Sequence, residues 1–432
     1  MSARIDRLYE YLADEEDARV CTDISDSACR EVPQNFLWIF ASQFLTKLGD
    51  ALASAKIILP WLLTSVGAPA FFSGVLVPIR ESGSLLPQLI IGGYIRRRRV
   101  RKWFFVAGAA LQGFAVAGVA WAGLQLQGAL AGGVVLLWLV LFSLARGLCS
   151  VASKDVLGKT IPRSRRGLIS GYCASAAGLV TLGIGGLLWF SARPDSDVYA
   201  LLLLTGAGCW LLAAFSYAQI IEYAGATDGG GHALKQAFTS LALLKTDNAF
   251  RRFVVVRCLM MSSGLAAPYF IILAQQGSGE RSLLNLGIFI FAGGVADLLS
   301  GIAWGRFADR SSRRVLLLTA LLTCAICAIG GLIAWYRWVD GIWPILGLFF
   351  LLGVTHQGVR LGRKTYVVDL ASGNRRTDYV AVSNSVIGLM LLVVGLAGAL
   401  LAQFSLPAVL GGFALTSLLA LLIGCGLPEA SG

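Results

Sequence analysis

Charged side chains are scarce in this chain of 432 residues: Asp, Glu, Lys and Arg make up only 14% of it, whereas 56% is hydrophobic. The mean hydropathy is +0.73. A soluble domain of this size has no use for so much apolar surface with so few charges. A helix needs about 20 apolar residues to cross the hydrocarbon core of a membrane, and we count about twelve such runs. The composition therefore predicts an all-α polytopic membrane protein with twelve transmembrane helices.

Other absences exclude further functional classes. No Gly-x-x-x-x-Gly-Lys-Ser/Thr loop is present, which argues against direct use of ATP, and no soluble segment contains a metal-ligand cluster or a catalytic constellation. We expect a protein that is not an enzyme and has no cofactor or metal. The first 33 residues lack an apolar core segment, so no cleavable signal peptide is predicted.

The cysteines give no disulfide framework, because their number is odd and they are scattered. Cys324 and Cys327 form a C-x-x-C inside an apolar helix. Packing is the expected role of this pair, and metal binding or redox chemistry is the alternative.

The formal net charge of +12 would indicate a nucleic-acid partner in a soluble chain. Here the cations are concentrated in alternate loops, where they set orientation in a membrane. These basic segments are 96–102, 159–166, 235–252, 306–314 and 375–376. The positive-inside rule then predicts a multi-pass protein of the cytoplasmic membrane with both termini in the cytoplasm and no nucleic-acid partner.

The apolar runs divide the chain into two groups of six. We expect spans at 35–64, 70–95, 103–123, 129–153, 167–191, 197–221, 252–275, 282–305, 314–336, 342–368, 379–403 and 406–427. The predicted parts are an acidic cytoplasmic tail (1–33), a first bundle (34–221), a cytoplasmic linker (222–251), a second bundle (252–427) and a short C-terminal tail (428–432). The linker contains three consecutive glycines and then an amphipathic pattern typical of a helix on the membrane surface. The acidic tail has helical spacing of apolar residues, and an interfacial helix and a solvated tail are both open for it.

One loop carries a recognisable motif. Residues 305–314 read GRFADRSSRR, with Gly305, Asp309, Arg310 and Arg313 at fixed positions of a Gly-x-x-Ala-Asp-Arg-x-x-Arg-Arg pattern. This pattern resembles the cytoplasmic loop signature of the major facilitator superfamily, the large class of twelve-helix secondary transporters. The resemblance implies two pseudo-symmetric six-helix halves that rock around a central path lined by helices 1, 4, 7 and 10.

Internal repeats support two such halves. With a shift of 210 residues, segment 153–179 aligns with 363–389 without a gap, and with a shift of 212, segment 93–102 aligns with 305–314. Parallel repeats of this kind are related by an axis along the membrane normal.

The first copy of the loop departs from the family pattern, because Arg97 stands where the aspartate is expected. We hypothesise two charge-swapped cytoplasmic contacts: Asp309 with Arg165 or Arg166, and the arginines 96–99, Arg97 among them, with Asp378. They would close an inner gate when the transporter opens outward. The alternative is that these arginines only fix the topology.

Several ionisable residues lie inside the predicted spans, where they are costly and usually face a polar cavity or each other. Cations near the middle of the membrane (Lys47, Arg80, Arg146, His356 and Arg360) outnumber acids (Asp50 and Glu81). A surplus of positive charge in a low-dielectric cavity favours an anion. The alternative is that the charges pair with each other for assembly. Lys56 is expected on the opposite side of helix 1, and Lys154, Arg363 and Lys364 are expected near lipid headgroups.

These observations predict a secondary active transporter of a small organic anion or zwitterion that works by alternating access. Coupling to protons needs a group whose proton affinity changes with exposure, and the candidates are Asp50, Glu81 and His356. The expected partners are the solute, protons and membrane lipids, and we expect a monomer. An exporter of amphipathic drugs or lipid-type compounds is one alternative. A non-transporting membrane scaffold or sensor is another.

Overall fold

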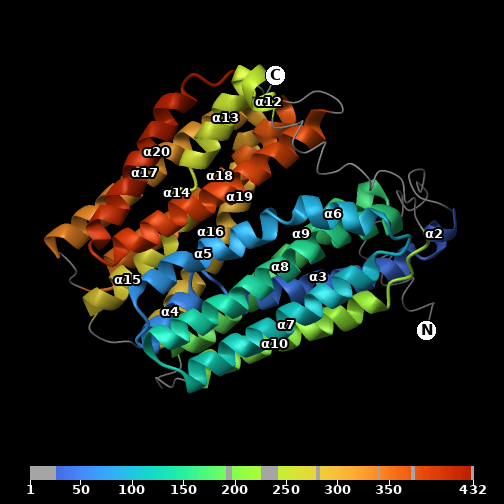
Figure 1. Cartoon of the computed structure of the whole chain (residues 1–432), viewed down its shortest axis with the longest axis horizontal. Coiled ribbons are helices and arrows are strands. Elements are labelled where there is room, and N and C mark those ends of the chain that lie inside the picture. Colours follow the sequence, from blue (N-terminus) through green and yellow to red (C-terminus); the bar gives the residue numbers. More distant parts are fainter. Residues whose placement is uncertain are drawn as a thin grey trace.

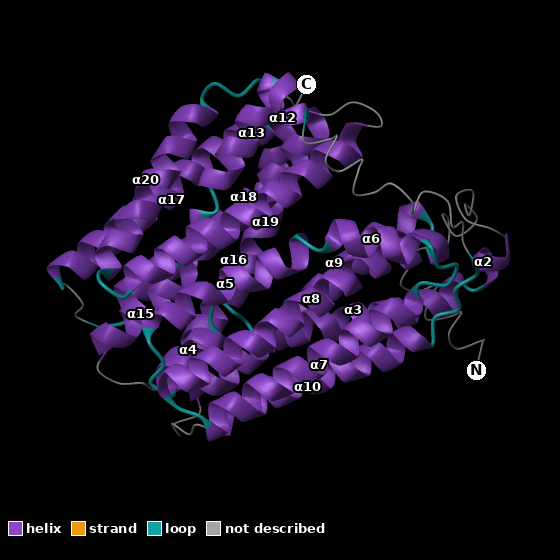
Figure 2. Cartoon of the chain, viewed as in Figure 1, coloured by secondary structure: helices purple, strands orange, loops and turns teal. Residues whose placement is uncertain are grey.

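The computed structural model describes residues 26–190, 197–224, 242–278, 283–337, 341–370 and 375–429. The regular structure in these ranges is all helical (Figure 2). The predicted acidic tail and linker fall largely outside the described residues. Of the cysteines within these ranges, seven are free, whereas Cys29 is disulfide-bonded, which the scattered cysteines did not predict.

The helices follow the predicted spans closely. The first half contains α2 (Asp26–Arg30), α3 (Val32–Leu52), α4 (Ile58–Ser65), α5 (Ala70–Leu85), α6 (Gln88–Arg96), α7 (Lys102–Gln125), α8 (Gly128–Thr160), α9 (Arg163–Phe190) and α10 (Asp197–Ala218). The second half contains α12 (Leu243–Thr246), α13 (Asn248–Leu259), α14 (Ser262–Leu265), α15 (Ala267–Ser278), α16 (Leu283–Arg310), α17 (Ser312–Tyr336), α18 (Trp343–Leu370), α19 (Arg375–Ala402) and α20 (Leu406–Gly424).

Three of the twelve membrane segments are interrupted: α3 with α4, α5 with α6, and α13 to α15. Proline explains the breaks before α4, α6 and α15, because its ring removes one N–H and is best tolerated in the first turn of a helix. Pro60 and Pro268 lie in the first turns of α4 and α15, and Pro87 directly precedes α6. Each break frees backbone groups inside the membrane, which is tolerated where the segment is buried in protein or lines a cavity.

Among the described residues, nine helices are long and apolar enough to cross a membrane by themselves. The other three predicted spans are the first (α3 and α4), the second (α5 and α6) and the eighth (α16). The first and second of these spans are each divided between two helices. All three carry interior charges: Lys47 with Asp50, Arg80 with Glu81, and Asp297.

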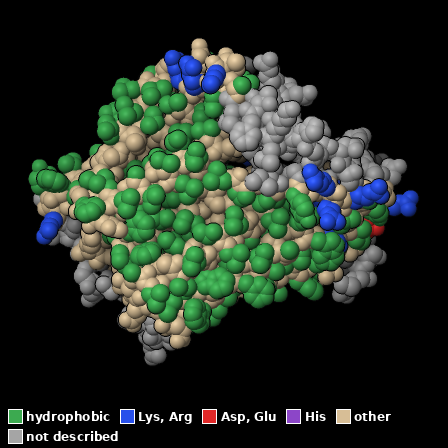
Figure 3. Space-filling model, in the orientation of Figure 1, with side chains coloured by type: hydrophobic (Ala, Val, Ile, Leu, Met, Phe, Trp, Pro, Cys, Tyr) green, Lys and Arg blue, Asp and Glu red, His purple; other side chains and the backbone are tan. Residues whose placement is uncertain are grey.

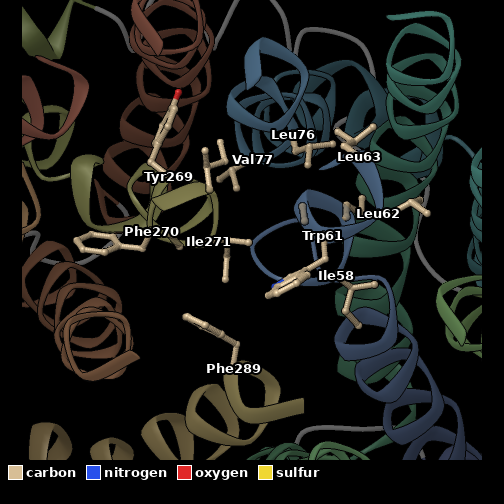
Figure 4. Packing of buried hydrophobic residues seen from close by; sticks show 14 of the residues in the cluster. Ile58, Trp61, Leu62, Leu63, Leu76, Val77, Tyr269, Phe270, Ile271 and Phe289 are labelled. Atoms are coloured by element: carbon tan, nitrogen blue, oxygen red, sulfur yellow. The ribbon is translucent and has the colours of Figure 1, made fainter. Parts of the chain in front are cut away.

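The two halves share a hydrophobic core at one end of the molecule only. We call the end with segments 96–102, 159–166 and 306–314 the basic end. At the opposite end one cluster joins residues of both halves, such as Trp61 and Leu76 with Phe270 and Phe289 (Figure 4). At the basic end each half has its own cluster, around Phe36 and Phe105 in the first and around Phe253 and Tyr366 in the second. The halves are therefore closed together at the opposite end and separate towards the basic end (Figure 1).

Two helix pairs make most of the contact between the halves, α5 with α19 and α9 with α16, and α15 also contacts α4 and α5. Glycine permits the closest approach. A Cβ atom on Gly395 would lie 2.0 Å from Pro78 Cγ, and one on Gly74 would lie 2.8 Å from Ala399 Cβ. Small residues let backbones pack this closely in membrane proteins.

The outer surface is apolar. Large side chains such as Leu130, Leu137 and Leu187 are exposed, and hydrophobic side chains cover much of the visible face in Figure 3, with Lys and Arg at its edges. The predicted repeat agrees with the helix ends, since α8 ends at Thr160 and α18 ends at Leu370, 210 residues later.

Candidate functional site

A central cavity of about 560 Å³ lies between the two halves. Its walls come from α3 and the α3–α4 break, α9, α14, α15, α16 and α18. Apolar side chains line part of the cavity, including Ile57, Ile290 and Phe349. Two helix bundles that move relative to each other need such a shared interior chamber if a solute is to pass between them.

Three cations line this cavity: Lys47 on α3, Lys56 in the α3–α4 break, and Arg360 on α18. Asp297 on α16 is the one carboxylate among the described lining residues, and it accepts a hydrogen bond from Gln357 Nε2. The lining charges sum to a surplus of cations. Because attraction is less screened in a low-dielectric chamber, this surplus favours an anionic group in the occupant.

The expectation for Lys56 is wrong. A continuous helix would place it away from Lys47, but α3 ends at Leu52 and the backbone turns before α4 begins at Ile58. Ser54 holds this turn, since its carbonyl accepts from Leu59 N at 3.0 Å and its hydroxyl accepts from Lys56 N at 3.3 Å. The break therefore brings Lys56 into the cavity.

His356 also lines the cavity, on α18. Its Nδ1 lies 3.1 Å from Ser263 Oγ on α14, so the two helices are joined by one hydrogen bond. The nearby charges are those of Lys56, Arg360 and Arg363. The ring thus lies among cations and one hydroxyl, with no carboxylate bonded to it among the described residues.

A second polar group lies beside the cavity, within the first half. Asp50 on α3 accepts a hydrogen bond from Arg80 on α5 at 2.9 Å and another from Arg146 on α8. The two arginine side chains are 11% and 32% exposed, and the Asp50 side chain is 21% exposed. These three residues do not line the cavity. Glu81 belongs to the same surroundings, with Arg80, Arg146 and Lys56 as the main charges acting on it.

Comparison with known proteins agrees with this architecture. Residues 252–429 match the family model of the Major Facilitator Superfamily. The xylose transporter XylE from E. coli, in an inward-open conformation, has a TM-score of 0.66 at 15% identity, with 91% of this chain and 96% of that chain covered. The nucleoside transporter NupG has a TM-score of 0.71 at 10% identity, with 91% and 100% covered. A POT family transporter in complex with a conjugated peptide has a TM-score of 0.66 at 12% identity, with 91% and 95% covered.

The second half of the chain matches the Major Facilitator Superfamily by sequence, and the likeness of fold to these solved transporters extends over both halves. No curated protein matches the chain by sequence. This likeness of fold confirms the twelve-helix, multi-pass architecture predicted from the sequence.

The predicted gate of this transporter is described only in part. The side chains of Gly305, Asp309, Arg165, Arg166 and Asp378 lie outside the described residues. Arg97 and Arg310 are exposed, and Arg313 donates to the carbonyl of Cys425 at 2.6 Å. The two charge-swapped contacts therefore stay predictions.

One polar cluster at the basic end was missed by sequence reasoning. Glu222, which follows α10, has a fully buried side chain. It accepts from the backbone N–H of Arg101 and Lys102 at 2.8 and 2.7 Å, and from Lys159 Nζ at 2.8 Å. The carboxylate thus binds the N-terminus of α7 and the end of α8 together. The sequence signal for this cluster was a single acidic residue, which directly follows the last span of the first half.

Proposed function

We propose that this transporter carries a small organic anion or zwitterion across the cytoplasmic membrane, and that transport is coupled to protons. The main support is the charge of the central cavity, where Lys47, Lys56 and Arg360 face one carboxylate, Asp297, among the described lining residues. A solute with an anionic group gains attraction from the three cations. A cationic group on the same solute has Asp297 as its partner.

The proposed carrier works by alternating access. The halves share one core at the end opposite to the basic loops and separate towards the basic end. We place the basic end and both termini in the cytoplasm, because short cytoplasmic loops carry an excess of Lys and Arg. The present conformation is then open to the cytoplasm. Rocking of the halves about the cavity would open the other side.

We assign proton coupling to Asp50 rather than to Glu81 or His356. Asp50 joins three helices of the first half through Arg80 and Arg146. Protonation would remove the negative charge that holds the two arginines and so loosen α3 from α5 and α8. Loss of one partner of a buried ion pair costs about 3–5 kcal/mol, enough to shift a conformational equilibrium.

Uptake into proteoliposomes tests the proposal. A panel of mono- and dicarboxylates, phosphate esters and amino acids is offered with and without a pH gradient. We expect uptake of at least one anionic or zwitterionic solute, faster with the gradient. Lys47→Gln and Arg360→Gln should each raise the KM about tenfold or more, since a charge-assisted hydrogen bond contributes about 1.5–3 kcal/mol.

Lys364→Gln is the matched control, because Lys364 is exposed on the same helix as Arg360 and does not line the cavity. It should leave the KM within about twofold. Transport of neutral amphipathic compounds that is unchanged by Lys47→Gln and Arg360→Gln would instead support the exporter.

A further inference from the structure

A group of arginines continues from the cavity towards the basic end in the second half. Arg360 and Arg363 lie three residues apart on α18, so they share one side of that helix. Arg257 lies on α13, close enough to Arg363 for the two charges to repel each other. Of the three, only Arg360 lines the cavity.

Arg257 is held by neutral partners. Its Nη1 donates to Ser383 Oγ, and its Nη2 donates to Asn384 Oδ1 at 2.9 Å. Its buried Nε has no hydrogen-bond partner among the described residues. A guanidinium has five N–H donors in a rigid fork, so two contacts from one side leave further donors for a ligand.

The arginines of the two halves differ in their counter-ions. In the first half, Arg80 and Arg146 share Asp50, and Arg101 pairs with Asp155 at 2.7 Å. In the part of the chain that the structure describes, no ion pair includes Arg257, Arg360 or Arg363. Repulsion between Arg360 and Arg363 adds to this excess of positive charge. The carboxylate that attracts Arg363 is Glu81, which belongs to the other half.

Neighbouring cations without counter-ions raise the free energy of a protein when they lie away from bulk water, and a bound anion offsets this increase. Arginine forks match the geometry of phosphate and carboxylate groups. Arg363 was expected among lipid headgroups, but it is half-buried, whereas the next residue, Lys364, is exposed. Ser383 and Asn384 hold the Arg257 guanidinium in place before any ligand arrives.

We propose that Arg257 and Arg363, beside Arg360, form a second anion-binding site on the basic side of the cavity, and that the transported solute carries two anionic groups. One group lies in the cavity between Lys47 and Arg360, and the other, a phosphate or a second carboxylate, lies between Arg363 and Arg257. The solute class is a dicarboxylate or a phosphate monoester that also carries a carboxylate. This inference rests on the proposed function for the transported solute, whereas the anion site itself does not depend on it.

Binding of inorganic phosphate to the full chain in detergent tests the site directly. Thermal unfolding is followed at constant ionic strength while phosphate replaces chloride. We expect phosphate to stabilise the wild type, and Arg257→Gln and Arg363→Gln each to raise the half-saturating concentration about tenfold or more. Lys364→Gln, the matched control, should change it less than twofold. Equal effects of all three variants, or no phosphate effect on the wild type, would overturn the site.

Transport tests the solute class. For a dianion, Arg257→Gln should raise the KM about tenfold, and for a monoanion of the same skeleton it should leave the KM unchanged. Equal changes for both solutes would overturn the assignment of two anionic groups. If the wild type carries no anion at all, the proposed function fails, and phosphate binding in detergent still decides on the site.

A lipid headgroup offers the same phosphate chemistry as a solute. Vesicles of phosphatidylcholine alone and vesicles with added phosphatidylglycerol distinguish the two sources. If the solute is the ligand, the KM for the dianion is the same in both. If phosphatidylglycerol competes with the solute, the KM of the wild type rises with the phosphatidylglycerol content, and the KM of Arg257→Gln does not. That result would support the anion site and overturn the proposal that the solute occupies it.

Discussion

Asp50 shows how one residue organises a helix bundle inside the membrane. Its carboxylate is the shared acceptor for Arg80 and Arg146, which come from two other helices. Under the shift of 210 residues, His356 occupies the position of Arg146, and its partner is the neutral Ser263. Among the described residues, Arg146 is therefore held by an ion pair, whereas the equivalent His356 is held by a hydrogen bond to a hydroxyl.

We expect Asp50→Asn to abolish the stimulation of uptake by a pH gradient. The amide keeps the shape of the side chain but cannot exchange a proton, and it leaves two arginines without their anion. Counterflow of the solute, which needs no gradient, should persist. The measurement is uptake and counterflow in the same proteoliposomes.

Asp155→Asn serves as the control, since it also removes an ion pair, with Arg101, at a place far from the cavity. It should leave the effect of the gradient intact. Full stimulation by the gradient in Asp50→Asn would remove Asp50 from the coupling mechanism.

Glu222 acts at the scale of elements, because it joins the start of α7 to the end of α8. We expect Glu222→Gln to lower the free energy of unfolding by about 3 kcal/mol, since it leaves the buried Lys159 contact without a charge partner. The KM for the solute should not change. Denaturation in detergent and uptake measure the two effects.

Glu429→Gln is the matched control, because Glu429 accepts one hydrogen bond from a hydroxyl, Ser311 Oγ, at 2.8 Å. An amide oxygen accepts the same bond, so the free energy of unfolding should change by less than about 1 kcal/mol. An equal loss in both variants would contradict the special role of Glu222.

We expect the close contact between α5 and α19 to stabilise the conformation in which the halves separate at the basic end. Gly395→Ala places a methyl group where Pro78 stands, so we expect it to push these helices apart and to reduce the population of this state. Spin labels on Arg97→Cys and Arg310→Cys, in a background without other reactive cysteines, measure the separation at the basic end. The mean distance should shorten.

Gly412→Ala in α20 is the control, because nothing lies within 4 Å of its added Cβ. It should leave the distance distribution unchanged. An unchanged distribution in Gly395→Ala as well would show that this contact does not set the conformational equilibrium.

At the scale of the whole molecule, the orientation in the membrane can be read with a native thiol. Cys425 is the one exposed residue among the described free cysteines, and it follows α20 at the basic end. A membrane-impermeant maleimide should label inverted vesicles and not intact cells. Cys425→Ser should abolish the labelling. Labelling of intact cells would reverse the proposed topology.

The fold could be predicted to a large extent because its signals are local. Apolar runs, basic loops and the shift of 210 residues are properties of the chain itself, and α8 and α18 end at matching positions. The breaks were missed. A hydropathy run does not show that α3 stops at Leu52 and α4 starts at Ile58, and for this reason Lys56 was placed on the wrong side.

The sequence by itself determined that this chain crosses a membrane many times in two related halves, because burial of apolar surface in lipid depends on composition and length alone. It also indicated which spans hold charges. Only the tertiary structure decided which charges meet. Asp50 finds Arg80 and Arg146, Lys47 and Lys56 face Arg360 across a cavity, and Arg257 has neutral partners. The reason is physical: an interior charge is compensated by residues distant in sequence, and helix packing alone sets those distances.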